Sequence, residues 1–141
     1  MRLRLVGTDL PVGSSHDDVH VGTQRGRETE QLVPVTAGRA VLDLQLRPRG
    51  GRDAVGPHAQ GRPGERFVYL VWVEGPERTM FRRAKLLLAD IPEPVWQAGL
   101  DGATIQAELG LTDRCGEPLC ARVPPDLVSW TVVPLSEAQG G

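Results

Sequence analysis

A run of seven consecutive apolar residues, 67–73 (FVYLVWV), constrains the fold more than any other feature of this 141-residue chain. The run is far shorter than the ~20 residues needed to cross a bilayer, and it is rich in the β-branched and aromatic residues that favour strands. Alternate side chains of a strand point to opposite faces, which separates Phe67, Tyr69, Val71 and Val73 from Val68, Leu70 and Trp72. Because both faces are apolar, we expect a central strand that is covered on both sides.

Most of the remaining apolar residues alternate with polar ones, and this period of two is typical of half-buried strands. The alternating segments are residues 2–6, 18–24, 40–49, 103–109 and 127–133. Residues 81–89 could form a helix, but the preceding strand and the short, turn-rich connection EGPER at 74–78 favour a hairpin of residues 67–73 and 81–89.

Glycine and proline, 17 and 12 residues, divide the chain into short pieces. One short helix is expected at about 93–99, with Pro94 in its first turn and Gly99 as a stop signal. The pattern as a whole predicts a mainly β fold, an antiparallel β-sandwich or small β-barrel with one short α-helix. We expect a single globular domain over residues 1–135 and, from composition, a disordered tail at 136–141.

The net charge of −2 argues against nonspecific nucleic-acid binding, which needs a strong basic excess. No segment has the length of a membrane span or of a signal-peptide core, so we expect a cytoplasmic protein without a membrane partner. Two cysteines, Cys115 and Cys120, are too few for a zinc site. Free thiols are expected in a reducing compartment, with a disulfide across a hairpin as the alternative.

Several segments resemble a bacterial domain-of-unknown-function family, number 5990 in that series. The resemblance rests on GPHAQGRPGERFVYLVW at 56–72, MFRRAKLLL at 80–88, VHVG at 19–22, LGLTDRCGEPLCARV at 109–123 and LVSW at 127–130. It covers nearly the whole chain and implies a small bacterial single-domain protein. It implies no activity, cofactor or catalytic residue.

The strongest indication of an anion site is the pair Arg83 and Lys85, which two-residue spacing places on one strand face about 6.5–7 Å apart. Phe81 precedes them on that face and offers an aromatic platform. The alternative is an edge strand whose charges discourage aggregation. In the preceding loop, Gln60 and Arg62 are candidates for a pocket mouth, although Arg62 and Glu65 can also satisfy each other within the turn.

His20 is the best candidate for acid–base chemistry, because Gln24 shares its strand face and histidine titrates near neutral pH. A polar residue on a wet face is the alternative. Asp18 and His20 could hold a metal ion from one strand face, but a third ligand has no evident source, so no metal site is expected.

The leading hypothesis is a small soluble protein that binds an anionic or polar-aromatic metabolite without a cofactor. In this hypothesis Arg62, Arg83 and Lys85 neutralise the ligand's charge, Gln60 orients it, and Tyr69 and Trp72 wall the pocket. One alternative is a cofactor-independent isomerase, cyclase or hydrolase with His20 as general base. A second is a protein-interaction module that pairs its sheet edges into a homodimer.

Overall fold

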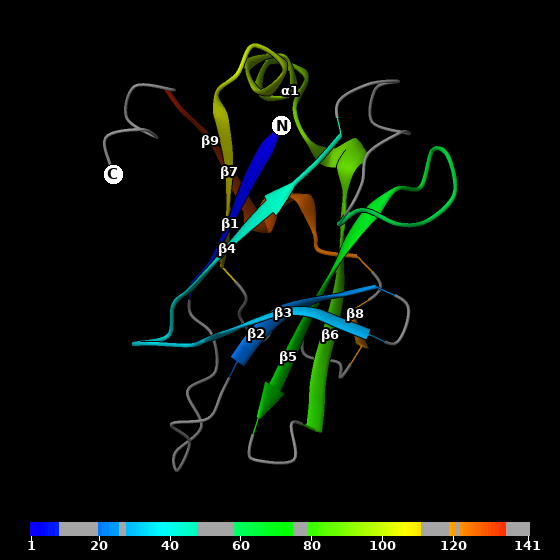
Figure 1. Ribbon diagram of the computed structural model, residues 1–141, viewed down its shortest axis with the longest axis vertical. Helices are drawn as coiled ribbons and strands as arrows, with labels where there is room; N and C mark the ends of the chain where they lie inside the picture. The colour runs from blue at the N-terminus through cyan, green and yellow to red at the C-terminus, as the bar shows by residue number, and fades with distance from the viewer. Residues whose placement is uncertain are drawn as a thin grey trace.

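The computed structural model describes residues 1–8, 20–25, 28–47, 58–74, 79–110, 119–120 and 122–134 (Figure 1). These residues form nine strands in two sheets. The strands are β1 (Arg2–Thr8), β2 (His20–Arg25), β3 (Glu28–Pro34), β4 (Ala40–Gln45), β5 (Phe67–Glu74), β6 (Thr79–Leu87), β7 (Thr104–Gly110), β8 (Leu119–Cys120) and β9 (Val128–Val133). The expected mainly β fold is confirmed.

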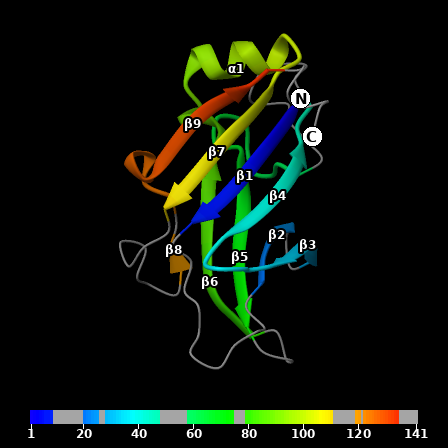
Figure 2. The same cartoon turned by 90° about the vertical axis from the view of Figure 1, so that its left-hand side faces the viewer.

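The two sheets enclose one hydrophobic core. In Figure 2 the strands β9, β7, β1 and β4 lie in front of β6 and β5. The four-stranded sheet has the order β4-β1-β7-β9 and the five-stranded sheet the order β3-β2-β5-β6-β8. The pairings β1–β7 and β6–β8 are parallel, and the other five among the described strands are antiparallel. Neither sheet closes on itself, so the architecture is a sandwich rather than a barrel.

Period-two alternation determines which side chains enter the core. In β4 the burial pattern alternates strictly between buried and exposed, as the sequence predicts. The buried rows are Leu3 and Leu5 of β1, Leu42 and Leu44 of β4, Ile105, Ala107 and Leu109 of β7, Val68, Leu70 and Trp72 of β5, and Ala84 and Leu86 of β6.

One α-helix, α1 (Glu93–Leu100), covers one end of the sandwich, where it contacts β7 and β9 (Figure 1). Pro94 lies in its first turn and Trp96 is buried against the core, so the helix expected at about 93–99 is confirmed. A 3-10 turn, Leu88–Asp90, joins β6 to α1, and a second one, Pro125–Leu127, precedes β9. No helix in the described part of the chain is long and apolar enough to cross a membrane.

Two strands, β3 and β8, are not foreseen by the sequence pattern. The residues of β3, ETEQLVP, show no alternation because it is an edge strand whose first three residues are all exposed. At residues 28–30, backbone pairing with β2 rather than side-chain burial therefore holds β3 in place. The predicted tail at 136–141 and the pairing of Cys115 lie outside the described residues.

A tight turn at residues 36–39 links β3 of one sheet to β4 of the other. Reciprocal backbone hydrogen bonds of 2.9 and 3.0 Å join Thr36 and Arg39. The two central residues, Ala37 and Gly38, have φ values of 55° and 76°, as a type I′ turn requires. Beyond the turn the strands diverge into their separate sheets.

Replacing Ala37 by asparagine is expected to stabilise the protein by about 1 kcal/mol. The left-handed region costs a residue with a Cβ about 1–2 kcal/mol, and asparagine tolerates it better than alanine. Asn-Gly is also a preferred pair at the centre of a type I′ turn. Urea unfolding should show a higher midpoint for Ala37→Asn. The control Ala89→Asn, at an exposed position with negative φ, should show no such gain. An unchanged midpoint in Ala37→Asn would contradict the turn assignment.

Candidate functional site

The outward face of β5 and β6 gathers aromatic and basic side chains. Antiparallel register places Phe67 opposite Leu87, Tyr69 opposite Lys85 and Val71 opposite Arg83. Directly opposed residues of a sheet share a face, so all six side chains lie on the side away from the core. Val71 is buried on this side, whereas Phe67, Tyr69, Arg83 and Lys85 are half-buried. The sequence expectation that both faces of β5 are fully covered therefore fails at its first residues.

Both cations on this face lie over aromatic rings. The ammonium of Lys85 is 4.6 Å from the Phe67 ring centre and 5.6 Å from that of Tyr69. The guanidinium of Arg83 is 4.6 Å from the Tyr69 ring centre. The two rings meet edge to face, with centres 5.1 Å apart. Each close contact is diagonal across the strand pair, so both cations lean toward the start of β5.

The loop before β5 folds back onto this face. Gln60 and Phe67 exchange two backbone hydrogen bonds of 2.9 Å, which closes residues 60–67 into a compact loop. Within it, Glu65 N–H donates to the Arg62 carbonyl at 2.9 Å. Pro63 and Gly64, with φ of 84° at the glycine, are the central residues that a type II turn favours. The turn brings the Arg62 and Glu65 side chains together in an ion pair of 3.1 Å.

The start of this loop is attached to β3 and β4. The Gln45 N–H donates to Nδ1 of His58 at 3.0 Å, and Gln31 Nε2 lies 3.3 Å from the other ring nitrogen. Gln31 also donates to the Asp43 carbonyl at 3.1 Å. The His58 ring therefore contacts both β3 and β4, and these contacts attach the start of the loop to the two strands.

The opposite side of the face is held by the segment after β8. The Val123 N–H donates to the Lys85 carbonyl at 2.8 Å. Arg122 makes two hydrogen bonds of 2.5 and 3.1 Å to the Asp90 carboxylate, and this hydrogen bonding, with the charge attraction, raises the pKa of Arg122. The backbone that carries Lys85 is therefore paired on both sides.

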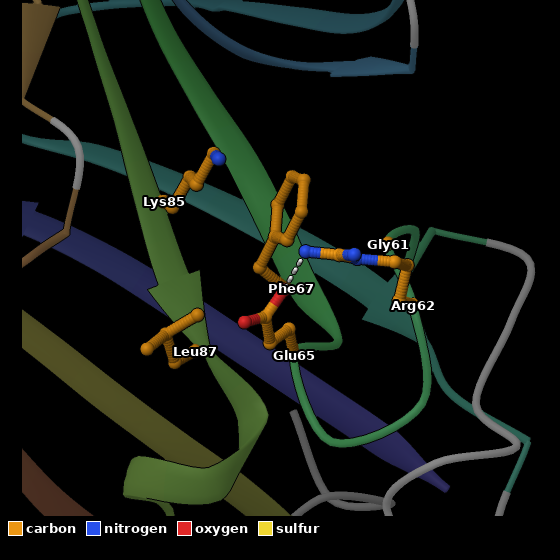
Figure 3. A pocket seen from close by; sticks show the side chains of 6 residues that line it. All are labelled: Gly61, Arg62, Glu65, Phe67, Lys85 and Leu87. Carbon is orange, nitrogen blue, oxygen red and sulfur yellow. Dashed lines mark hydrogen bonds and ion pairs between the residues drawn. The ribbon is translucent and has the colours of Figure 1, made fainter.

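An open pocket of about 430 Å³ lies between the loop and the two strands (Figure 3). Its lining residues are Gly61, Arg62, Glu65, Phe67, Lys85 and Leu87. Gly61 packs closely against its neighbours, because a Cβ at this position would lie 2.6 Å from the Glu65 carbonyl oxygen and 2.8 Å from the Phe67 ring. The volume lies within the ~300–1,000 Å³ that is usual for small-molecule sites.

The charges around this pocket are mostly positive. Arg62 and Lys85 line it and Arg83 lies one step further along the face, against the single carboxylate of Glu65. In the described part of the chain, neither Arg83 nor Lys85 forms an ion pair. The structure thus places two cations beside aromatic rings, and no carboxylate of the described residues forms an ion pair with either of them. This arrangement is suited to an anion with an apolar part.

The structure brings together part of the set of residues expected from the sequence. Arg62 and Lys85 line the pocket, and Tyr69 and Arg83 lie beside it. Arg62 also forms the ion pair with Glu65 that the sequence offered as its alternative role. Gln60 is turned away, since its side chain donates to the Gln24 carbonyl at 2.6 Å.

Trp72 and His20 lie elsewhere. Trp72 is 1% exposed and faces the sandwich core, because it lies an odd number of residues from Tyr69 along β5 and so points to the opposite face of the strand. It cannot wall this pocket. His20 shares the outward face but pairs with Val73, four residues from Tyr69, or roughly 13 Å along the strand. The structure therefore does not unite a candidate base with the cations.

Four pocket residues escaped the sequence reasoning as ligand contacts: Gly61, Glu65, Phe67 and Leu87. Two of them could have been found from strand periodicity. Phe67 is two residues from Tyr69 and Leu87 is two residues from Lys85, so each shares a strand face with a residue that was expected in the site. Phe81 is the aromatic platform that the sequence predicts, and its side chain lies outside the described part of the structure. No group of three potential metal ligands occurs among the described residues, which do not include Asp18.

A family model matches residues 1–133 and describes a family of unknown function, DUF5990. Comparison with curated proteins and with solved structures gives no match.

Proposed function

The chain belongs to the DUF5990 family, which has no assigned function, and we propose that it binds a small anion with an aromatic or apolar part in the outward-facing pocket. The position of Lys85 carries the proposal. Its ammonium lies over the Phe67 ring at 4.6 Å, in a pocket that has Leu87 as a second apolar wall.

Partial burial against a ring removes water from the Lys85 ammonium, and a desolvated charge gains most from an opposite charge. Among the described residues no carboxylate fills that role. A ligand anion beside Lys85 would supply the missing charge, and Arg62 would offer additional donors. The apolar part of the ligand would then contact Phe67 and Leu87.

Binding rather than catalysis is the function that this geometry supports. General acid–base catalysis needs a titratable group within hydrogen-bond reach of the reacting atoms. His20, the candidate base from sequence, lies outside the pocket. We therefore propose no reaction for this pocket.

Lys85→Gln is expected to weaken binding of the probe 3-phenylpropionate at least tenfold. A hydrogen bond to a charged group contributes about 1.5–3 kcal/mol, and 1.4 kcal/mol corresponds to a factor of ten in affinity. Isothermal titration calorimetry of the folded protein measures the change. Chemical-shift perturbation at Phe67 and Leu87 locates the site.

Arg4→Gln provides the charge-matched control. Arg4 lies on the outer face of the other sheet, where it pairs with Asp43 at 3.2 Å. Its loss changes the net charge by the same amount but should leave the affinity for 3-phenylpropionate within twofold. Equal affinity in wild type and Lys85→Gln, or no saturable binding at millimolar probe, would overturn the proposal.

A further inference from the structure

The pocket contains a carboxylate, Glu65, that a site for simple anions would be better without. One oxygen of Glu65, Oε2, accepts a hydrogen bond from Arg62 Nη2 at 3.1 Å. The other oxygen, Oε1, has no hydrogen-bond partner in the described part of the chain. Because a carboxylate offers about four acceptor positions, Glu65 retains capacity to accept hydrogen bonds from a ligand.

The opposite charges occupy different parts of the pocket. Figure 3 shows the Glu65 carboxylate next to Arg62 at the loop, and the Lys85 ammonium apart from it on β6, with Phe67 between them in this view. Lys85 has no ion-pair partner among the described residues. The site therefore has a cationic end at Lys85, an anionic acceptor at Glu65 and an apolar wall formed by Phe67 and Leu87.

We infer that the pocket selects a dipolar ligand, an α-amino acid with an apolar or aromatic side chain. This inference rests on the proposed function and names its ligand class. The ligand carboxylate lies at Lys85, its ammonium donates to Glu65 Oε1, and its side chain contacts Phe67 and Leu87. A ligand with a carboxylate alone meets repulsion from Glu65, so this residue provides both attraction for the dipolar ligand and discrimination against the simple anion.

The test measures two probes that differ only in the α-ammonium group, L-phenylalanine and 3-phenylpropionate, with wild type and Glu65→Gln. Wild type should bind L-phenylalanine more tightly than 3-phenylpropionate. Glu65→Gln should weaken L-phenylalanine binding about tenfold, while affinity for 3-phenylpropionate stays the same or rises. The Glu65 side chain is 66% exposed, so the variant should keep the wild-type unfolding midpoint.

The outcomes separate this inference from the proposed function. If 3-phenylpropionate binds in a Lys85-dependent manner but Glu65→Gln strengthens binding of both probes, Glu65 merely competes for Arg62. The pocket then takes simple anions, and the dipolar inference is wrong. If neither probe binds wild type at millimolar concentration, the proposed function and this inference fail together. The opposite response of the two probes to Glu65→Gln is the result that only the dipolar site predicts.

Discussion

Gly22→Ala is expected to destabilise the protein by about 3 kcal/mol or more. A Cβ at this position of β2 would lie 1.8 Å from the carbonyl oxygen of Gln31 and 2.8 Å from Leu32 Cδ2. The first of these atoms belongs to the backbone of the paired strand, so no side-chain rotation can relieve the overlap. Overpacking costs typically 1–3 kcal/mol and more when the backbone must move, which places this substitution at the upper end of the range.

The damage should extend beyond the two paired strands. The Gln31 side chain bonds the Asp43 carbonyl and contacts His58, which anchors the loop before β5. Displacing β3 therefore disturbs the attachment of the loop that carries Arg62. We expect Gly22→Ala to lower the affinity for 3-phenylpropionate as well, although Gly22 does not line the pocket.

Gly64→Ala separates steric overlap from the cost of backbone conformation. Gly64 has a φ of 84°, yet nothing lies within 4 Å of its Cβ position. Its replacement should cost only the ~1–2 kcal/mol of the left-handed region. Urea unfolding of both variants makes the comparison. A loss in Gly22→Ala no larger than that in Gly64→Ala would mean that β3 moves away at little cost.

The sequence was sufficient for the strands that bury alternate side chains. Apolar periodicity predicts the strict alternation of β4. The apolar run of β5, which has apolar residues on both faces, and the turn residues after it predict the hairpin of β5 with β6. The strand β3 could not be found in this way, because its first three side chains are exposed at the sheet edge, where pairing with β2 supplies the stabilisation. Two pairings are also parallel, β1–β7 and β6–β8, and no local pattern encodes the direction of a distant neighbour.

The sequence predicted the kinds of residue in the candidate site, basic and aromatic, but only some of the residues that form it. The spacing of Arg83 and Lys85 correctly placed both on one face of β6. The closeness of Lys85 to Arg62 depends on the backbone bridge between Gln60 and Phe67, which leaves no periodic signal in the sequence. The need for glycine at position 61 likewise arises from the Phe67 ring beside it, a contact that the sequence pattern does not encode.

Trp72 and Tyr69, three residues apart on β5, should respond to substitution in opposite ways. Trp72 is 1% exposed within the core, and Trp→Ala substitutions in cores cost about 3–5 kcal/mol. Since small domains have about 5–15 kcal/mol of stability in total, Trp72→Ala should leave the protein barely folded. Tyr69 is half-buried on the outward face, so Tyr69→Ala should cost less than half as much.

Ligand affinity should show the reverse order. Tyr69 contacts the Phe67 ring and lies under Arg83, and its ring centre is 5.6 Å from the Lys85 ammonium. Tyr69→Ala should therefore weaken 3-phenylpropionate binding several-fold, because the cations lose the surface that positions them. Trp72→Phe retains an aromatic core residue and a folded protein, and it should bind the probe as wild type does. A stronger effect on binding from Trp72→Phe than from Tyr69→Ala would show that the two faces of β5 do not act independently. The ligand site would then depend on core packing, and the outward-facing pocket alone would not explain binding.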